Sequence, residues 1–116
     1  MLKTIYRLAR PALFALSPED AHEATLKALE CGVHPRQIGV DDAVLRQTVF
    51  GLSFSNPVGI AAGYDKDARV PDAVLAMGCG FAEIGTVTPK PQQGNPKPRI
   101  FRLVTDQGLI NRLGFN

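Results

Sequence analysis

The sequence predicts an α/β fold in which a small helical piece precedes the first unit of a parallel sheet. Two observations favour it. Residues 1–36 show helical patterning without a strand pattern, whereas Gly, Pro and β-branched residues dominate from about residue 47. Strand-like runs at 57–62 and 81–87 flank a helical run at 68–77. Strand, helix and strand in this order form a βαβ unit, so we expect the two strands to be parallel.

Composition excludes several classes of protein. The chain has 116 residues, of which 45% are hydrophobic and 21% charged, and these fractions are typical of one globular domain. A formal net charge of only +2 argues against nucleic-acid binding as the main role. No apolar run reaches the ~18 residues of a membrane-spanning helix, and the N-terminus is a poor secretory signal.

The cysteines predict neither a disulfide nor a metal site. Cys31 and Cys79 lie far apart in the sequence, as is usual for thiols in a reducing compartment. Cys31 and His34 have the spacing of metal ligands, but two ligands do not make a zinc site. We therefore expect no bound metal.

The helical piece is expected to contain two helices. The first should run from Leu2 to Arg10, because Pro11 is expected to end or kink it. Ser17 as the N-cap and Pro18 at the first helical position start the second helix, which should end near Gly32. The two helices should pack as an antiparallel or V-shaped pair, with an apolar cleft lined by Leu8, Leu13, Phe14 and Leu26.

The first helix carries a basic face. Lys3, Arg7 and Arg10 follow one another at helical spacing. This face fits a helix that packs on the body of the protein and leaves its cations in solvent. It also fits a helix that lies on an anionic membrane surface.

Turn residues divide the second half. Gly51 separates two short strand-like runs, 48–50 and 52–54, which predicts a hairpin. Gly78 should stop the helix at 68–77. Pro89–Arg99 contains four of the nine prolines and reads as an extended loop, followed by a possible strand pair at 100–104 and 108–111.

Three loops could carry chemistry, because ligands of parallel α/β folds bind beyond the carboxyl ends of the strands. Small residues and Gly63 at 61–67 would let a flat ligand approach the backbone, and Lys66 would add a cation. Thr86 could donate from the next strand end, and Asn111 and Arg112 would suit a small anion. Each loop taken alone also fits an ordinary turn.

Taken together, the motifs resemble the class 2, quinone-dependent dihydroorotate dehydrogenases over the whole chain. The carrying segments are SPEDAH at 17–22, NPVGIAAGYDK at 56–66, EIGTVTPKPQ at 83–92, GNPKPRIFRL at 94–103 and NRLGFN at 111–116. The resemblance implies the N-terminal part of an FMN-binding TIM-type (β/α)8 barrel preceded by a two-helix cap. Residues 1–36 would form the helical membrane and quinone-tunnel extension, and residues 37–116 the first barrel strands and helix.

The resemblance also implies an activity and its site. Such enzymes oxidise dihydroorotate to orotate in pyrimidine biosynthesis and pass electrons through FMN to a membrane quinone. They bind peripherally, here expected at the cytoplasmic side of a bacterial inner membrane, and no nucleic acid is involved. The matching FMN positions are Ala62, Gly63, Tyr64, Asp65, Lys66 and Thr86. The matching substrate positions are Lys66, Asn111, Arg112, Leu113, Gly114 and Phe115, and the matching quinone-tunnel positions are His22 and Arg102.

Length limits these expectations. A TIM barrel needs roughly 250 residues, and only 60 follow from Pro57 to Asn116. We expect an N-terminal portion of a longer enzyme, without its general base, that is inactive and binds no FMN stably by itself. Two other interpretations remain: another FMN-dependent barrel oxidoreductase, or a non-enzymatic helical module at a membrane surface.

Overall fold

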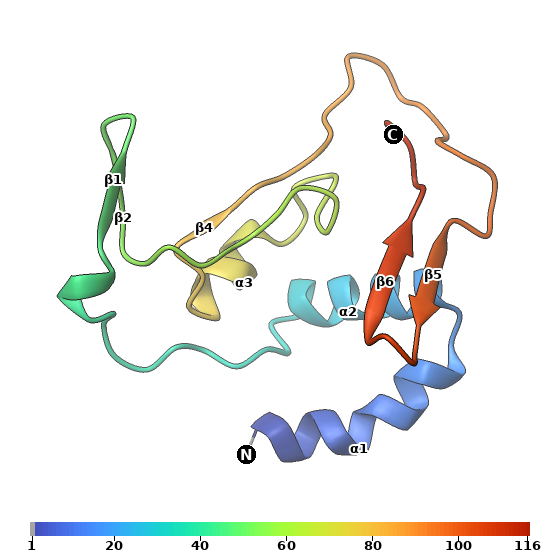
Figure 1. The fold of residues 1–116 in the computed structure, drawn as a ribbon, viewed down its shortest axis with the longest axis horizontal. Helices are drawn as coiled ribbons and strands as arrows, with labels where there is room; N and C mark the ends of the chain where they lie inside the picture. Colours follow the sequence, from blue (N-terminus) through green and yellow to red (C-terminus); the bar gives the residue numbers. More distant parts are fainter. Residues whose placement is uncertain (1) are drawn as a thin grey trace. The chain divides into compact units, whose positions relative to one another are not determined.

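A computed structural model describes the backbone of residues 2–116 and the side chains from residue 6 onward. The chain forms two compact units, which are described separately (Figure 1). Unit 1 consists of the N-terminal segment up to Lys27 together with Thr88–Asn116, and unit 2 is Ala28–Val87.

The first helix, α1 (Leu2–Ala15), contains Pro11 in its interior. The prediction that the helix ends at Arg10 was therefore wrong. Pro11 lacks the N–H that would donate to the carbonyl of Arg7, and the helix nevertheless continues. Separately, another part of the chain supplies donors at the end of α1. The guanidinium of Arg102 donates to the carbonyls of Leu13 at 3.0 Å and Leu16 at 2.9 Å. These bonds satisfy carbonyls that no later helical turn could reach.

The second helix, α2 (Pro18–Glu30), begins and ends as predicted. The Ser17 hydroxyl accepts a hydrogen bond from the Asp20 backbone N–H at 3.1 Å and donates to the Asp20 carboxylate at 2.6 Å. At the other end, Gly32 has φ +74°, and Val33 N–H donates to Ala28 O at 2.8 Å. This is the left-handed glycine cap that terminates many helices.

The predicted helix pair is only partly reproduced. The chain reverses direction between α1 and α2 (Figure 1). Leu26 is buried, but Leu8 is 78% exposed. These two leucines therefore do not share a buried environment.

A hairpin completes unit 1. Strands β5 (Ile100–Leu103) and β6 (Gly108–Asn111) pair antiparallel from Ile100 opposite Asn111 to Leu103 opposite Gly108, which confirms the predicted strand pair. The buried apolar residues of this unit come from α2, β5 and the segment after β6, namely Ala21, Leu26, Ile100 and Leu113.

Unit 2 begins with a short 3-10 helix, η1 (Ala43–Leu45), and the predicted hairpin of β1 (Gln47–Val49) and β2 (Leu52–Phe54). Phe50 and Gly51 both have positive φ, at 50° and 79°. That combination fits the tight two-residue turn that matches the twist of a hairpin.

The predicted βαβ unit follows. Strands β3 (Gly59–Ile60) and β4 (Phe81–Ala82) are parallel and flank α3 (Pro71–Ala76), although both strands are shorter than predicted. Helix α3 begins at Pro71 rather than Ala68, since Ala68 has φ +56°. Gly78, with φ +108°, follows the helix as expected.

The β-sheets are small. Within residues 2–116 the strands form three separate two-stranded sheets, so a closed barrel stays a prediction. Large apolar side chains such as Ile38 and Val40 are almost fully exposed. No helix in the described residues is both long and apolar enough to cross a membrane.

Candidate functional site

In unit 2 the loops that follow β3 and β4 are joined by backbone hydrogen bonds. Glu83 N–H donates to Ile60 O at 2.8 Å and extends the parallel ladder by one step. Gly63 N–H then donates to Gly85 O at 2.9 Å, and Gly85 N–H donates to Asp65 O at 3.2 Å. The structure thus brings the predicted positions 63–65 next to the residue that precedes Thr86.

Asp65 holds the first of these loops. Its carboxylate is 3% exposed and accepts hydrogen bonds from Arg69 N–H at 2.8 Å and Val70 N–H at 2.7 Å. These two bonds shape residues 65–70 into a turn, which explains why α3 starts late. Because the carboxylate is used by the loop itself, Asp65 could reach a ligand only through its backbone.

The loop offers space for a flat ligand. Gly63 has φ +100°, and no atom lies within 4 Å of the place where a Cβ would stand. Ala62 and Thr86 are exposed, while Tyr64 and Lys66 are half-buried. An open glycine, small neighbours, a hydroxyl and a lysine fit the edge of an FMN ring system.

Among the residues that the structure describes, no group of three or more His, Cys, Asp or Glu side chains could hold a metal ion. Both cysteines are free thiols.

In unit 1 the predicted substrate stretch continues from β6. Arg112 N–H donates to Arg99 O at 2.7 Å, so the pairing with β5 extends one residue beyond the strand. Leu113 is buried, Gly114 has φ +83°, and Phe115 is 71% exposed. Asn111 is also exposed. One buried apolar residue, Leu113, therefore lies between exposed residues on both sides.

The Arg112 guanidinium is engaged with the protein itself. Its Nε and Nη2 donate to Pro98 O at 3.3 and 3.1 Å, and its Cζ lies 5.7 Å from the centre of the Phe101 ring. The sequence suggested a cation for a small anion at this position. In this structure the same group fastens the stretch to the loop before β5.

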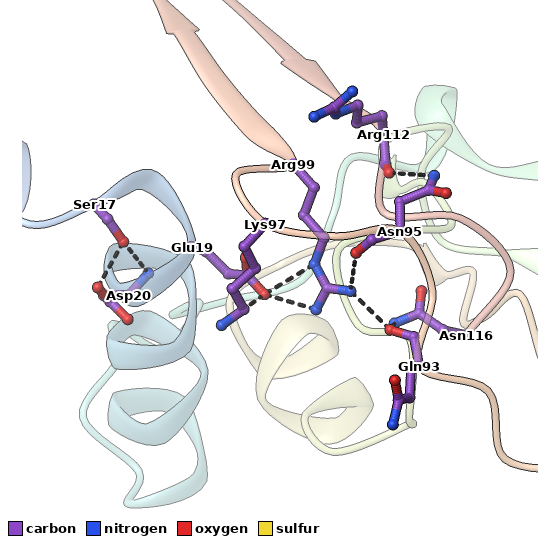
Figure 2. A network of polar contacts seen from close by, with 9 residues as sticks. All are labelled: Ser17, Glu19, Asp20, Gln93, Asn95, Lys97, Arg99, Arg112 and Asn116. Atoms are coloured by element: carbon purple, nitrogen blue, oxygen red, sulfur yellow. Dashed lines mark hydrogen bonds and ion pairs between the residues drawn. The ribbon is translucent and has the colours of Figure 1, made fainter.

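Sequence reasoning missed the residues that hold this stretch in place. Asn95 donates from its side chain to Arg112 O at 2.7 Å (Figure 2). Its N–H donates to Leu113 O at 2.9 Å. Gly94 approaches so closely that a Cβ there would lie 2.4 Å from Leu113 O. The pair Gly94-Asn95 within a proline-rich loop was the sequence signal that could have pointed to these residues.

Arg99 links that loop to α2. Its Nη1 donates to Gln93 O at 2.9 Å and Asn95 O at 3.2 Å, and its Nη2 donates to Glu19 Oε1 at 2.7 Å (Figure 2). Lys97 lies 3.4 Å from the same carboxylate oxygen. The hydrogen bond from Arg99 is the main reason that the pKa of Glu19 lies below its usual value.

A groove of about 660 Å³ lies between α1 and the β5–β6 hairpin in unit 1. Three arginines, Arg7, Arg10 and Arg102, line it together with aromatic and aliphatic side chains. The guanidinium carbons of Arg10 and Arg102 lie 4.5 and 4.8 Å from the centre of the Phe14 ring. Of the two predicted quinone-tunnel residues, Arg102 lines this groove and the half-buried His22 does not.

These features define an α/β protein with a ligand-accessible strand end in one unit and a backbone-clamped Asn-Arg stretch in the other. The family model for dihydroorotate dehydrogenase matches residues 44–116. The chain belongs to the dihydroorotate dehydrogenase family.

Known relatives are similar in sequence over the whole length of the chain. Proteins named dihydroorotate dehydrogenase (quinone) from Rhizobium johnstonii and Chelativorans sp. are 60% and 59% identical to it over 116 residues. The chain is covered completely and spans 32% of the length of each relative. A crystal structure of dihydroorotate dehydrogenase from Eimeria tenella in complex with ferulenol is 47% identical, with a TM-score of 0.83, over 90% of this chain and 29% of that chain.

Proposed function

We propose that the chain is the N-terminal portion of a quinone-dependent dihydroorotate dehydrogenase, hereafter the full-length enzyme. That enzyme oxidises dihydroorotate to orotate in pyrimidine biosynthesis, and its electrons pass through FMN to a membrane quinone. The observation that carries the proposal is the pair of joined loops after β3 and β4, with open space over Gly63. Whole-chain similarity to enzymes of that name supports it.

The loops after β3 and β4 would hold the cofactor. In this proposal FMN contacts Ala62–Lys66 and Thr86, mainly at their backbone groups. The Asp65 carboxylate does not take part, because it accepts the N–H groups of the turn. FMN, when bound, supplies the acceptor for the hydride. The protein positions the ring and supplies charge, and the half-buried Lys66 is the cation of this loop.

The substrate would be held by Lys66 and by Asn111–Phe115. A lysine ammonium complements the carboxylate of dihydroorotate, and an Asn amide offers both a donor and an acceptor to a pyrimidine edge. Leu113 packs inward and fixes the stretch, whereas Asn111 and Phe115 remain exposed. No residue of this chain is assigned as the general base.

The helical segment 1–36 would provide the quinone tunnel and the membrane contact. Arg102 lines the groove beside α1, and its aromatic and aliphatic neighbours suit a quinone ring. His22 is assigned to the same tunnel on the resemblance. Arg7 and Arg10 are exposed cations of α1, which favours peripheral binding to an anionic membrane surface. The cytoplasmic side of a bacterial inner membrane is proposed on the resemblance.

The activity is tested with the full-length enzyme carrying Lys66→Ala. Quinone reduction driven by dihydroorotate should show a KM for dihydroorotate raised about 10- to 100-fold, the range for one lost charge-assisted contact. FMN content should be retained, because other groups hold the cofactor. Lys90→Ala, an exposed lysine of the following loop, is the matched control. Loss of FMN with a normal KM would contradict the assignment of Lys66.

Membrane binding is tested by replacing Lys3, Arg7 and Arg10 together with Ala. Each cation near an anionic surface contributes about 1 kcal/mol. Sedimentation with anionic vesicles should therefore weaken and become less salt-dependent. Alanine at Arg36, Arg46 and Lys90 removes the same charge from exposed sites elsewhere. Equal sedimentation of the two variants would show that the basic face is only solvated surface.

A further inference from the structure

The loop Gln93–Arg99 encloses the backbone of the predicted substrate stretch. We propose that Asn95 and Arg99 are positioning residues for the stretch Asn111–Phe115, and that Glu19 of α2 fixes Arg99 in turn. The inference rests on the proposed function, because it concerns the same substrate site. All residues involved belong to unit 1.

Asn95 fixes two successive peptide groups. Its side-chain amide donates to Arg112 O at 2.7 Å (Figure 2). Its own N–H donates to Leu113 O at 2.9 Å. A Cβ at Gly114 would stand 3.2 Å from the Asn95 side-chain nitrogen. Rotation of either peptide plane would break one of these bonds, so Asn95 determines how the backbone at 112–114 presents itself.

Arg99 contacts both Asn95 and the stretch that Asn95 holds. Its backbone carbonyl accepts from Arg112 N–H at 2.7 Å, while its guanidinium donates to Gln93 O and Asn95 O. The Arg99 side chain is 14% exposed. The guanidinium spreads five donors over three nitrogens in a fixed plane, and Arg99 uses all three nitrogens, whereas a lysine carries its donors on a single nitrogen.

Glu19 orients the fork. Its Oε1 accepts from Arg99 Nε at 3.1 Å and from Nη2 at 2.7 Å, whereas Lys97 approaches the same oxygen at 3.4 Å with a side chain that is 67% exposed. The well-formed bonds to Arg99 therefore matter more than the exposed lysine pair. Through Arg99 and Asn95, the first turn of α2 contributes to the geometry of the substrate stretch.

The consequence is that residues without a place in the site should govern substrate affinity. In the full-length holoenzyme, Asn95→Ala should raise the KM for dihydroorotate about tenfold, which is the factor for ~1.4 kcal/mol. The KM for the quinone and the FMN content should stay unchanged. Arg99→Lys, which keeps the charge without the fork, should give a rise of the same kind.

Lys97→Ala is the matched control, because it removes the other cation of Glu19 and leaves the Arg99 fork in place. It should leave all kinetic constants as they are. Asn95→Asp has nearly the same volume but cannot donate to Arg112 O, so it should behave like Asn95→Ala. If neither Asn95 variant folds, the residue is purely structural and the proposal is overturned.

Hydrogen exchange provides a readout that does not depend on activity. The amide of Arg112 and its neighbours up to Phe115 should exchange faster in Asn95→Ala than in Lys97→Ala. Wild-type enzyme that fails to oxidise dihydroorotate would refute the proposed function, and the exchange data would still decide the positioning role. Active wild type with an unchanged substrate KM in Asn95→Ala, or equal rises in both KM values, would refute the positioning role alone.

Discussion

The two candidate binding segments are held by opposite chemistry. In unit 1, the irregular backbone is held by cationic donors: Arg99, Arg102 and Arg112 all donate to main-chain carbonyls. In the loop after β3 of unit 2, it is held by an acceptor: the Asp65 carboxylate receives the main-chain N–H groups of Arg69 and Val70.

The difference follows from which backbone groups lack a hydrogen-bond partner within the helices and strands. The end of α1 and the extended segment before β5 expose carbonyls, which need donors, and a guanidinium supplies several from one side chain. The turn between β3 and α3 instead exposes N–H groups ahead of a helix, which need an acceptor. A nearby Asp solves the second problem locally. The first is solved by Arg99 within its own loop, by Arg112 from 14 residues away and by Arg102 from more than 80 residues away.

Asp65→Ala should have the largest effect on stability. The substitution leaves two backbone N–H groups without their acceptor, one of them at the buried Val70, and each such group costs roughly 1–3 kcal/mol. We expect the free energy of unfolding of the full-length enzyme to fall by about 3 kcal/mol in urea titrations. The exposed Asp67 of the same loop is the control, and Asp67→Ala should change it by less than about 0.5 kcal/mol. Equal losses of unfolding free energy in the two variants would show that the Asp65 carboxylate does not stabilise this loop as an acceptor.

Arg102→Ala should have the next largest effect. It deletes the donors to Leu13 O and Leu16 O and the contact with Phe14, for a loss of about 2 kcal/mol. Amide exchange in α1 should accelerate accordingly. Arg10→Ala removes only a contact with the same ring and should cost about 0.5–1 kcal/mol. If exchange in α1 is the same in both variants, the carbonyl contacts do not hold the helix end.

Loss of the Glu19 charge in acid should produce the smallest effect. The pKa of Glu19 is lowered mainly by the hydrogen bond from Arg99. A depressed pKa contributes stability that is present above the usual 4.5 and is lost as pH falls through the folded value. Glu19→Gln should therefore reduce stability at neutral pH, and the difference from wild type should vanish in acid. A difference that is constant with pH would show that the charge of Glu19 is irrelevant.

Local signals in the sequence predicted much of the fold. Gly51 marked the hairpin turn, Ser17 and Pro18 marked the start of α2, and Gly32 marked its end. In each case the residue that sets the boundary of an element lies within that element or close beside it in the sequence. Such boundaries are decided by a few neighbouring side chains, which is why the sequence reveals them.

The errors arose where a side chain outside the element contacts its end. Helix α1 continues past Pro11, and Arg102 satisfies its final carbonyls from 86 to 89 residues away. The start of α3 was misplaced because the buried Asp65 takes the N–H groups of Arg69 and Val70, a contact that periodicity does not report.

The same reasoning applies to the candidate site. The glycine and the lysine of the loop after β3 were identified from local pattern, and the structure places Gly63 beside Gly85. Asn95, Arg99 and Glu19 were not identified, because Glu19 and Arg99 are 80 residues apart in the sequence. No spacing rule links an acidic residue in the first turn of one helix to a loop near the other end of the chain.

The contact between Arg102 and α1 also sets an order of events during synthesis. The carbonyls of Leu13 and Leu16 leave the ribosome 89 and 86 residues ahead of the guanidinium that later binds them. At roughly 5–20 residues per second, the helix end waits about 4–18 s for its partner. During that interval the donors that satisfy those carbonyls in the folded structure are absent. The end of α1 therefore exists before the hairpin that secures it.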